Sequence, residues 1–160
     1  MKEPELIRVN IGRIAISSEG ETLQTILGSC VGIAFLFKER GIFGLAHCLL
    51  PETPGGTENC TEARFVDQGI TTLIREMRLQ TSDLRSVEAV LAGGASLFRD
   101  GASRIGSKIG SKNSHAAKSI LKRLQIKVVF EDCGQNFGRQ LFVYGRDGTF
   151  EVKKIQTEVA

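Results

Sequence analysis

The 160-residue chain has the length of one domain, and its composition, 41% hydrophobic and 24% charged, is ordinary for a globular protein. Its net charge of +3 comes from scattered basic residues, so we expect no nucleic-acid partner. No apolar stretch approaches the roughly 18 residues that span a bilayer, and the opening residues MKEPELIRVN lack the apolar segment of a signal peptide. We therefore expect a cytoplasmic protein that is not embedded in a membrane.

The first part of the chain predicts a buried hairpin. Residues 8–17 alternate in part and indicate an opening strand. Residues 31–37, VGIAFLF, form the β-branched and aromatic run of a buried strand, and residues 42–50 predict a second strand. The turn KERG lies between them, so the two strands should pair as an antiparallel hairpin. Pro51 ends the second strand, and the Pro/Gly/Thr-rich loop ETPGGTENCTEA follows.

Two helices and a strand are predicted next. Apolar residues at helical spacing indicate a helix within residues 63–80, and residues 87–95 predict a strand that ends in paired glycines. Residues 93–112 are rich in Gly, Ser and basic residues and predict a long loop. Asn113 is a good N-cap and would begin the second helix.

Three closing strands complete the predicted fold, at residues 126–132, 139–145 and 150–155. The last two are joined by RDGT, which is a strong hairpin turn. The pattern predicts the α/β class: a single mixed domain over residues 1–160 with antiparallel hairpins.

Two glycine-rich segments, RIGSKIGSK and AGGAS, could be taken for phosphate-binding loops. From Gly101 the sixth residue is Gly106, but Ser107 stands where the G-x-x-x-x-G-K-[ST] motif requires lysine. Neither segment completes G-x-G-x-x-G. The sequence therefore disfavours nucleotide binding.

The four cysteines, Cys30, Cys48, Cys60 and Cys133, would permit two disulfides, but thiols in a cytosolic chain are kept reduced. No pair has close C-x-x-C spacing and the chain has only two histidines, so we expect no structural zinc site.

Cys30 stands apart because it lies between Gly28 and Gly32 at the entrance of a buried strand, where glycines permit a tight turn. Pairing of the predicted hairpin would bring residues near Cys30 beside residues near His47, with opposed Cβ atoms about 5 Å apart. A cysteine nucleophile needs such a base close by. From these residues alone two interpretations stay open: a catalytic Cys–His dyad, or a buried histidine beside a small core cysteine.

The other candidate groups predict no chemistry. Cys48 alternates to the opposite face from His47 and should lie in the core. His115 should be solvated at the polar opening of a helix. Cys60 in a loop and Cys133 at a strand end have nothing nearby that would activate them.

Several blocks occur together in a specific order: LGSCVGI, GLAHCLLP, AGGASLF, IGSKN and EDCGQN, between residues 27 and 136. In this order, with histidine 17 positions after the cysteine, they resemble CheD, the chemoreceptor glutamine deamidases of bacterial chemotaxis. The resemblance implies an α/β fold similar to the catalytic domain of deamidating bacterial toxins. It also implies hydrolysis of receptor glutamine side chains to glutamates by a Cys–His–Thr triad.

By this resemblance Cys30 is the nucleophile and His47 the base. Some family members have the threonine six residues before the cysteine, where this chain has Gln24. A one-residue shortening would make Thr25 equivalent, and Thr22 is a weaker candidate. Backbone N–H groups near Ser29 and Cys30 are expected to hold the oxyanion.

The partners implied are the cytoplasmic domains of methyl-accepting chemoreceptors and a CheC-type phosphatase, with no metal or organic cofactor. The chain could alternatively be a non-catalytic module that binds such a phosphatase or receptors. A papain-like peptidase is disfavoured, because in that class the base lies more than about a hundred residues after the cysteine.

Overall fold

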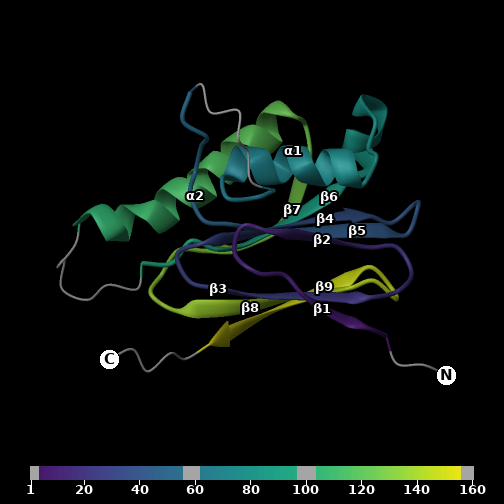
Figure 1. Cartoon of the computed structure of the whole chain (residues 1–160), viewed down its shortest axis with the longest axis horizontal. Coiled ribbons are helices and arrows are strands. Elements are labelled where there is room, and N and C mark those ends of the chain that lie inside the picture. The colour runs from purple at the N-terminus through teal and green to yellow at the C-terminus, as the bar shows by residue number, and fades with distance from the viewer. Residues whose placement is uncertain (1–3, 56–61, 97–103, 156–160) are drawn as a thin grey trace.

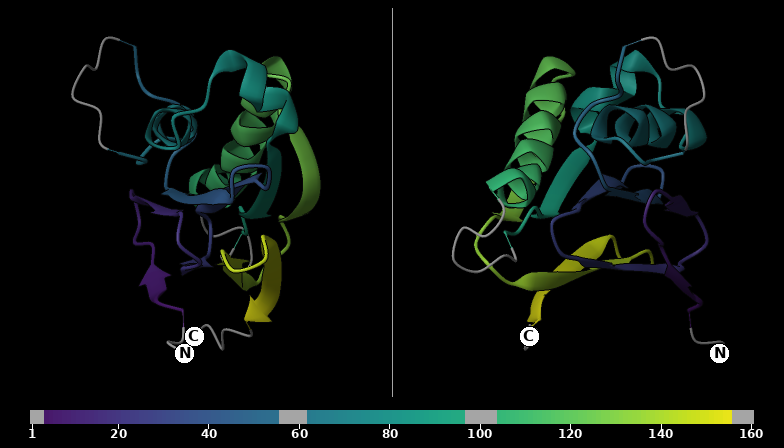
Figure 2. Two further views of the ribbon diagram at one scale, coloured as in Figure 1. Left: turned by 90° about the vertical axis from the view of Figure 1, so that its right-hand side faces the viewer. Right: turned by 60° about the vertical axis from the view of Figure 1, so that its left-hand side comes forward.

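Two β-sheets and a pair of helices form three stacked layers in the computed structural model of the chain, which describes residues 4–55, 62–96 and 104–155 (Figure 1). The helices cover one face of the larger sheet, and the smaller sheet covers its other face (Figure 1). One apolar cluster fills each of the two interfaces. The larger sheet is therefore the middle layer (Figure 2).

The middle layer has five strands, in the order β2 (Ile14–Ser17), β5 (Ile42–Cys48), β4 (Val31–Phe37), β6 (Glu88–Gly93) and β7 (Lys127–Cys133). The smaller sheet has the order β1 (Leu6–Arg8), β3 (Thr22–Leu27), β8 (Gly138–Tyr144) and β9 (Thr149–Ile155). The helices are α1 (Val66–Glu76), the short 3-10 helix η1 (Thr81–Ser86) and α2 (Arg104–Arg123).

Both sheets are mixed, because β1 pairs with β3 and β6 pairs with β7 in parallel, while the remaining pairs are antiparallel. The predicted mixed α/β fold class is confirmed. The closing strands β7, β8 and β9 lie within one residue of their predicted bounds, and the RDGT segment joins β8 to β9 in an antiparallel pair.

The predicted hairpin is the pair β4–β5, in which Val31 lies opposite Cys48 and Gly32 opposite His47. All seven residues of β4 are buried, because both of its faces are covered. Val31, Ile33 and alternate residues beyond them face the helices, and the others face the smaller sheet. A middle-layer strand needs apolar residues on both faces, which explains the unbroken run VGIAFLF.

Helix α1 packs on β5 at close range. A Cβ on Gly69 would lie 2.6 Å from Cys48 Sγ, and one on Gly44 would lie 2.8 Å from a methyl of Leu73. The absent side chains at these two glycines therefore allow the helix to approach the sheet. Neither α1 nor α2, as far as the structure describes the chain, has the length and hydrophobicity to cross a lipid bilayer.

The N-terminal part of the chain differs from the prediction. The single strand expected at residues 8–17 is wrong: β1 ends at Arg8 and β2 begins at Ile14, in different sheets. Gly12, with φ +79°, lies in the connection between the two sheets. Strand β3 was not predicted, because its sequence, TLQTIL, does not alternate between apolar and polar residues. The polar residues Gln24 and Thr25 are both buried in it.

Helix α2 also differs. It begins at Arg104, so the loop predicted for residues 93–112 is wrong over its second half, and Asn113 is not an N-cap. Asn113 lies inside the helix and is fully buried. Glycine and serine lower helix propensity, which produced the prediction of a loop, but tertiary packing of the helix on β6 overrides that preference.

Candidate active site

His47 of β5 and Thr25 of β3 meet between the two sheets. Thr25 Oγ1 lies 2.6 Å from His47 Nδ1, and the same hydroxyl donates a hydrogen bond of 2.7 Å to the Val9 carbonyl. Because a hydroxyl has one hydrogen and gives it to Val9, it must accept the Nδ1–H of the imidazole. This tautomer leaves Nε2 with a lone pair, and among the described residues Nε2 has no hydrogen-bond partner.

Cys30 lies on the same side of the middle sheet as His47. It belongs to the apolar cluster between the two sheets, together with Leu27 and Leu141 of the smaller sheet. Val31, the first residue of β4, lies opposite Cys48, the last residue of β5, so Cys30 immediately precedes β4. The predicted meeting of the thiol and the imidazole on one face of the hairpin agrees with this register.

Residues 28–30, which we call the cysteine loop, are held by the end of β6. The backbone N–H of Gly94 donates to the Cys30 carbonyl at 2.8 Å, and that of Ala95 donates to the Gly28 carbonyl at 3.0 Å. Gly93 has φ +110°, and a Cβ there would lie 2.2 Å from the Cys30 carbonyl oxygen. Glycine is therefore required at this position for β6 to approach the loop so closely.

Burial keeps both candidate catalytic groups uncharged at neutral pH. It raises the pKa of the Cys30 thiol to about 11, although the backbone N–H of Cys30 itself lowers it. It lowers the pKa of His47 to about 4, although the Val9 carbonyl raises it. The resting pair is therefore a thiol and a neutral imidazole, not an ion pair.

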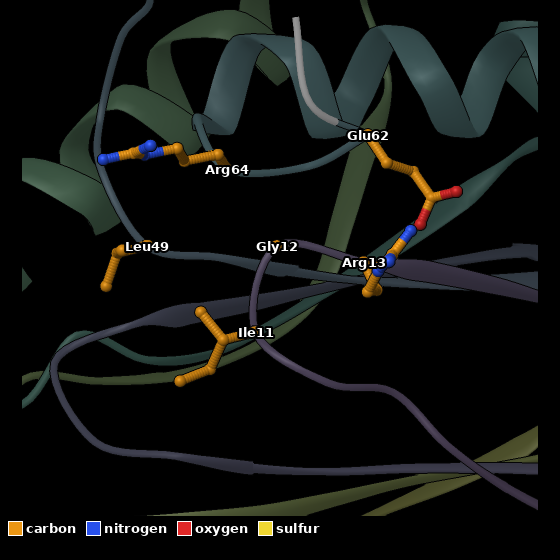
Figure 3. A pocket seen from close by; sticks show the side chains of 6 residues that line it. All are labelled: Ile11, Gly12, Arg13, Leu49, Glu62 and Arg64. Atoms are coloured by element: carbon orange, nitrogen blue, oxygen red, sulfur yellow. The ribbon is translucent and has the colours of Figure 1, made fainter.

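Two cavities adjoin the residues around His47. One, of about 400 Å³, is lined by Thr25 and His47 and by the exposed side chain of Ile26. The other, of about 420 Å³, is lined by Ile11, Gly12, Arg13, Leu49, Glu62 and Arg64; in the view of Figure 3, Arg13 and Glu62 lie on one side of it and Leu49 and Arg64 on the other. Gly12, in its wall, donates its N–H to the His47 carbonyl at 2.8 Å.

The remaining candidates lie away from this site. Thr22 is three residues from Thr25 on β3, so its side chain is on the opposite face and cannot make the contact that Thr25 makes. Cys48 is fully buried on the helix side of β5, as predicted, and its burial raises the pKa of the thiol. His115 is exposed on α2, Cys133 is partly buried, and Cys60 lies outside the described residues.

Sequence reasoning missed two contributors to the site. The Val9 carbonyl is a backbone atom, so no residue type indicates it. Asn113 was assigned to a helix start, although its Nδ2 donates to the carbonyls of Ser29 and Leu49. The block IGSKN was the signal available for it.

The family model described as "CheD chemotactic sensory transduction" matches residues 49–154, about two thirds of the chain. The chain belongs to the CheD family. Among CheD relatives, one from Bdellovibrio bacteriovorus is 36% identical over 92% of this chain and 93% of its own, and one from Caldanaerobacter subterraneus subsp. tengcongensis is 37% identical over 96% and 95%. Both bear the name "Probable chemoreceptor glutamine deamidase CheD".

An archaeal CheD relative, from Archaeoglobus fulgidus, is 35% identical over 92% of both chains. The CheD family model begins after His47, whereas these relatives cover at least 92% of the chain and so include residues 25–47. A solved Neisseria meningitidis structure of family DUF152 has a TM-score of 0.51 at 12% identity, over 91% of this chain and 71% of its own. At that identity the likeness shows a shared fold alone.

Proposed function

We propose that this protein deamidates specific glutamine side chains of methyl-accepting chemoreceptors, with Cys30 as nucleophile, His47 as base and Thr25 as the group that orients the imidazole. The single observation that carries the proposal is the 2.6 Å contact between Thr25 Oγ1 and His47 Nδ1, which leaves Nε2 free to take a proton. The names of relatives that cover nearly the whole chain supply the substrate class.

The reaction begins with a neutral pair. His47 Nε2 takes the proton of the Cys30 thiol as the sulfur attacks the carboxamide carbon of the glutamine. Because burial disfavours both charged forms, proton transfer and attack should occur together, with no thiolate stored beforehand. A C–S bond forms, and the carboxamide oxygen becomes an oxyanion.

We assign the backbone N–H of Cys30 as the donor to that oxyanion. This N–H lowers the pKa of the Cys30 thiol, so it interacts with the attacking sulfur. A fixed N–H beside the attacking atom stabilises the charge that develops on the substrate oxygen.

Collapse of the tetrahedral intermediate breaks the C–N bond. His47 returns its proton to the leaving nitrogen, ammonia departs, and a thioester to Cys30 remains. His47 then takes a proton from water, which attacks the thioester, and the proton passes to the Cys30 sulfur as the glutamate leaves. The sum is glutamine plus water giving glutamate plus ammonia, with the enzyme unchanged.

The test is to incubate the purified chain with a chemoreceptor cytoplasmic fragment in H₂¹⁸O and to map modified residues by mass spectrometry. We expect conversion of specific glutamines to glutamates, each carrying one ¹⁸O. Cys30→Ala should abolish it, and Cys48→Ala, a second buried cysteine of the same hairpin, should not.

The opposite result would be an unmodified fragment that nevertheless binds the protein. That outcome would favour the alternative of a non-catalytic module that binds receptors or a CheC-type phosphatase. The CheC-type partner stays a prediction from the resemblance.

A further inference from the structure

Asn113 joins the two halves of the candidate active site. It lies near the middle of α2 and is fully buried. Its Nδ2 donates 3.0 Å to the Ser29 carbonyl, in the cysteine loop, and 2.9 Å to the Leu49 carbonyl, two residues beyond His47. One side-chain amide therefore ties the loop that carries the thiol to the strand that carries the base.

A glycine contact brings Asn113 within reach. A Cβ on Gly110, one turn before Asn113, would lie 2.5 Å from the carbonyl oxygens of Gly94 and Ala95. A Cβ on Gly94 would in turn lie 2.7 Å from the Gly110 carbonyl oxygen. Only glycine on both sides allows the helix to come so close, which explains the AGGAS and IGSKN blocks without a bound phosphate.

The contacts fix the direction of the peptide groups in the cysteine loop. Its three successive carbonyls each accept a hydrogen bond: Gly28 from the Ala95 N–H, Ser29 from Asn113 Nδ2, and Cys30 from the Gly94 N–H. The Ser29 carbonyl and the Cys30 N–H belong to one planar trans peptide group, so they point in opposite directions. By holding the carbonyl, Asn113 turns the N–H of Cys30 away from α2.

We propose that Asn113 is a positioning residue for deamidation: it orients the Ser29–Cys30 peptide so that the Cys30 N–H binds the oxyanion. The proposal rests on the proposed function. Of the three donors that hold the loop carbonyls, Asn113 is the one side chain, so substitution can remove it without altering the backbone. Both hydrogen bonds of its Nδ2 go to backbone carbonyls, so it would act on the reaction through the cysteine loop.

The test compares two reactions of Cys30 in the full chain. Deamidation of a chemoreceptor cytoplasmic fragment passes through an oxyanion. Alkylation by iodoacetamide displaces iodide from a saturated carbon and forms none. Both rates are expressed per titratable Cys30 thiol, so that incompletely folded material does not count.

We expect Asn113→Ala to lower kcat about a hundredfold, the effect of losing an oxyanion donor, with KM within about threefold of the parent. Alkylation should slow far less than deamidation, because burial, not the Cys30 N–H, is the larger cause of the shifted pKa of the thiol. Asn113→Asp should do the same, because a carboxylate oxygen would face two carbonyl oxygens. The matched control is Ser114→Ala: Ser114 is the next residue and is also buried, and its hydroxyl donates to Gly110 and Ser111 within its own helix. It should change neither rate.

Two results would overturn the proposal: deamidation near the parental rate in both Asn113 variants, or parallel loss of deamidation and alkylation, which would indicate a merely structural role. If Asn113→Ala does not fold, the deamidation and alkylation rates of Asn113→Asp, whose side chain has the same size, decide between these outcomes. A parent chain that is alkylated normally but never converts glutamine would refute the proposed function, and the role of Asn113 would fall with it.

Discussion

Thr25 and His47 form a hydrogen bond that crosses from one sheet to the other, with 2.6 Å between Oγ1 and Nδ1. The imidazole is thereby held in the tautomer that presents Nε2 as a base. A neutral hydroxyl stabilises the imidazolium less than a carboxylate would, so its contribution should be smaller than that of the base itself.

We therefore expect Thr25→Ala and Thr25→Val to slow deamidation about ten- to a hundredfold, less than the loss of a full general base. Thr25→Ser should keep much of the rate, because the hydroxyl remains. Thr22→Ala is the control, since Thr22 lies on the other face of β3. Initial rates on one receptor fragment test the series. An inactive Thr22→Ala together with a fully active Thr25→Val would show that Thr22, not Thr25, orients the imidazole.

Removal of the base should have a larger effect. His47→Ala should lower kcat by about a hundred- to ten-thousandfold, the range for losing a general base. It should also slow alkylation of Cys30 near neutral pH, because burial raises the pKa of that thiol to about 11 and the variant has no imidazole to take its proton. His115→Ala, at the exposed histidine, should change neither rate. Equal alkylation rates in the parent and His47→Ala would refute the pairing.

Folding stability should depend on pH through His47. Burial lowers its pKa from 6.5 to about 4, so below pH 6.5 the unfolded chain binds a proton that the folded chain does not bind until about pH 4. The free energy of unfolding should therefore decrease as pH falls through this window, and at pH 4 it should be about 3 kcal/mol lower than at neutral pH. Urea denaturation of the parent and His47→Gln from pH 4 to 7 measures it.

The His47→Gln variant should show a shallower dependence on pH over this window, by the amount attributed to His47. The same slope in both proteins would mean that His47 binds a proton equally well in the folded and the unfolded chain.

The two buried cysteines of the hairpin should respond oppositely to truncation. Cys48 is fully buried against Gly69 of α1, so Cys48→Ala should lower the free energy of unfolding by about 1 kcal/mol and spare turnover. Cys30→Ala should abolish turnover with a smaller loss of stability, because Cys30 precedes β4 and is less completely buried than Cys48. Chemical denaturation and deamidation rates separate the effects. Unfolding of Cys30→Ala would make Cys30 a core residue instead.

Gly94→Ala should be strongly destabilising. Gly94 has φ +63°, and an added Cβ would lie 2.7 Å from the Gly110 carbonyl oxygen, a backbone atom that cannot turn away. Gly20→Ala is the matched control, since Gly20 has φ +87° with nothing within 4 Å of an added Cβ. We expect a loss of about 1 kcal/mol for Gly20→Ala and clearly more for Gly94→Ala, measured by thermal unfolding. Equal losses would show that the helix can shift.

The β4–β5 hairpin could be predicted from sequence because its determinants are local. An apolar run, a four-residue turn and a second run specify antiparallel pairing, and the two-residue period then separates His47 from Cys48. The family resemblance added the roles of Cys30 and His47, and the observed register is compatible with both.

Tertiary structure decided which threonine contacts His47 and where the helix beside the site begins. The sequence offered Thr25 and, more weakly, Thr22; the packing of β3 against the middle sheet places Thr25 against His47 and Thr22 on the other face. Gly110 and Asn113 indicate a loop and a helix cap by local propensity, yet both lie inside α2. There the energy of close packing against Gly94, and of hydrogen bonds to carbonyls 64 and 84 residues away, outweighs the local preference.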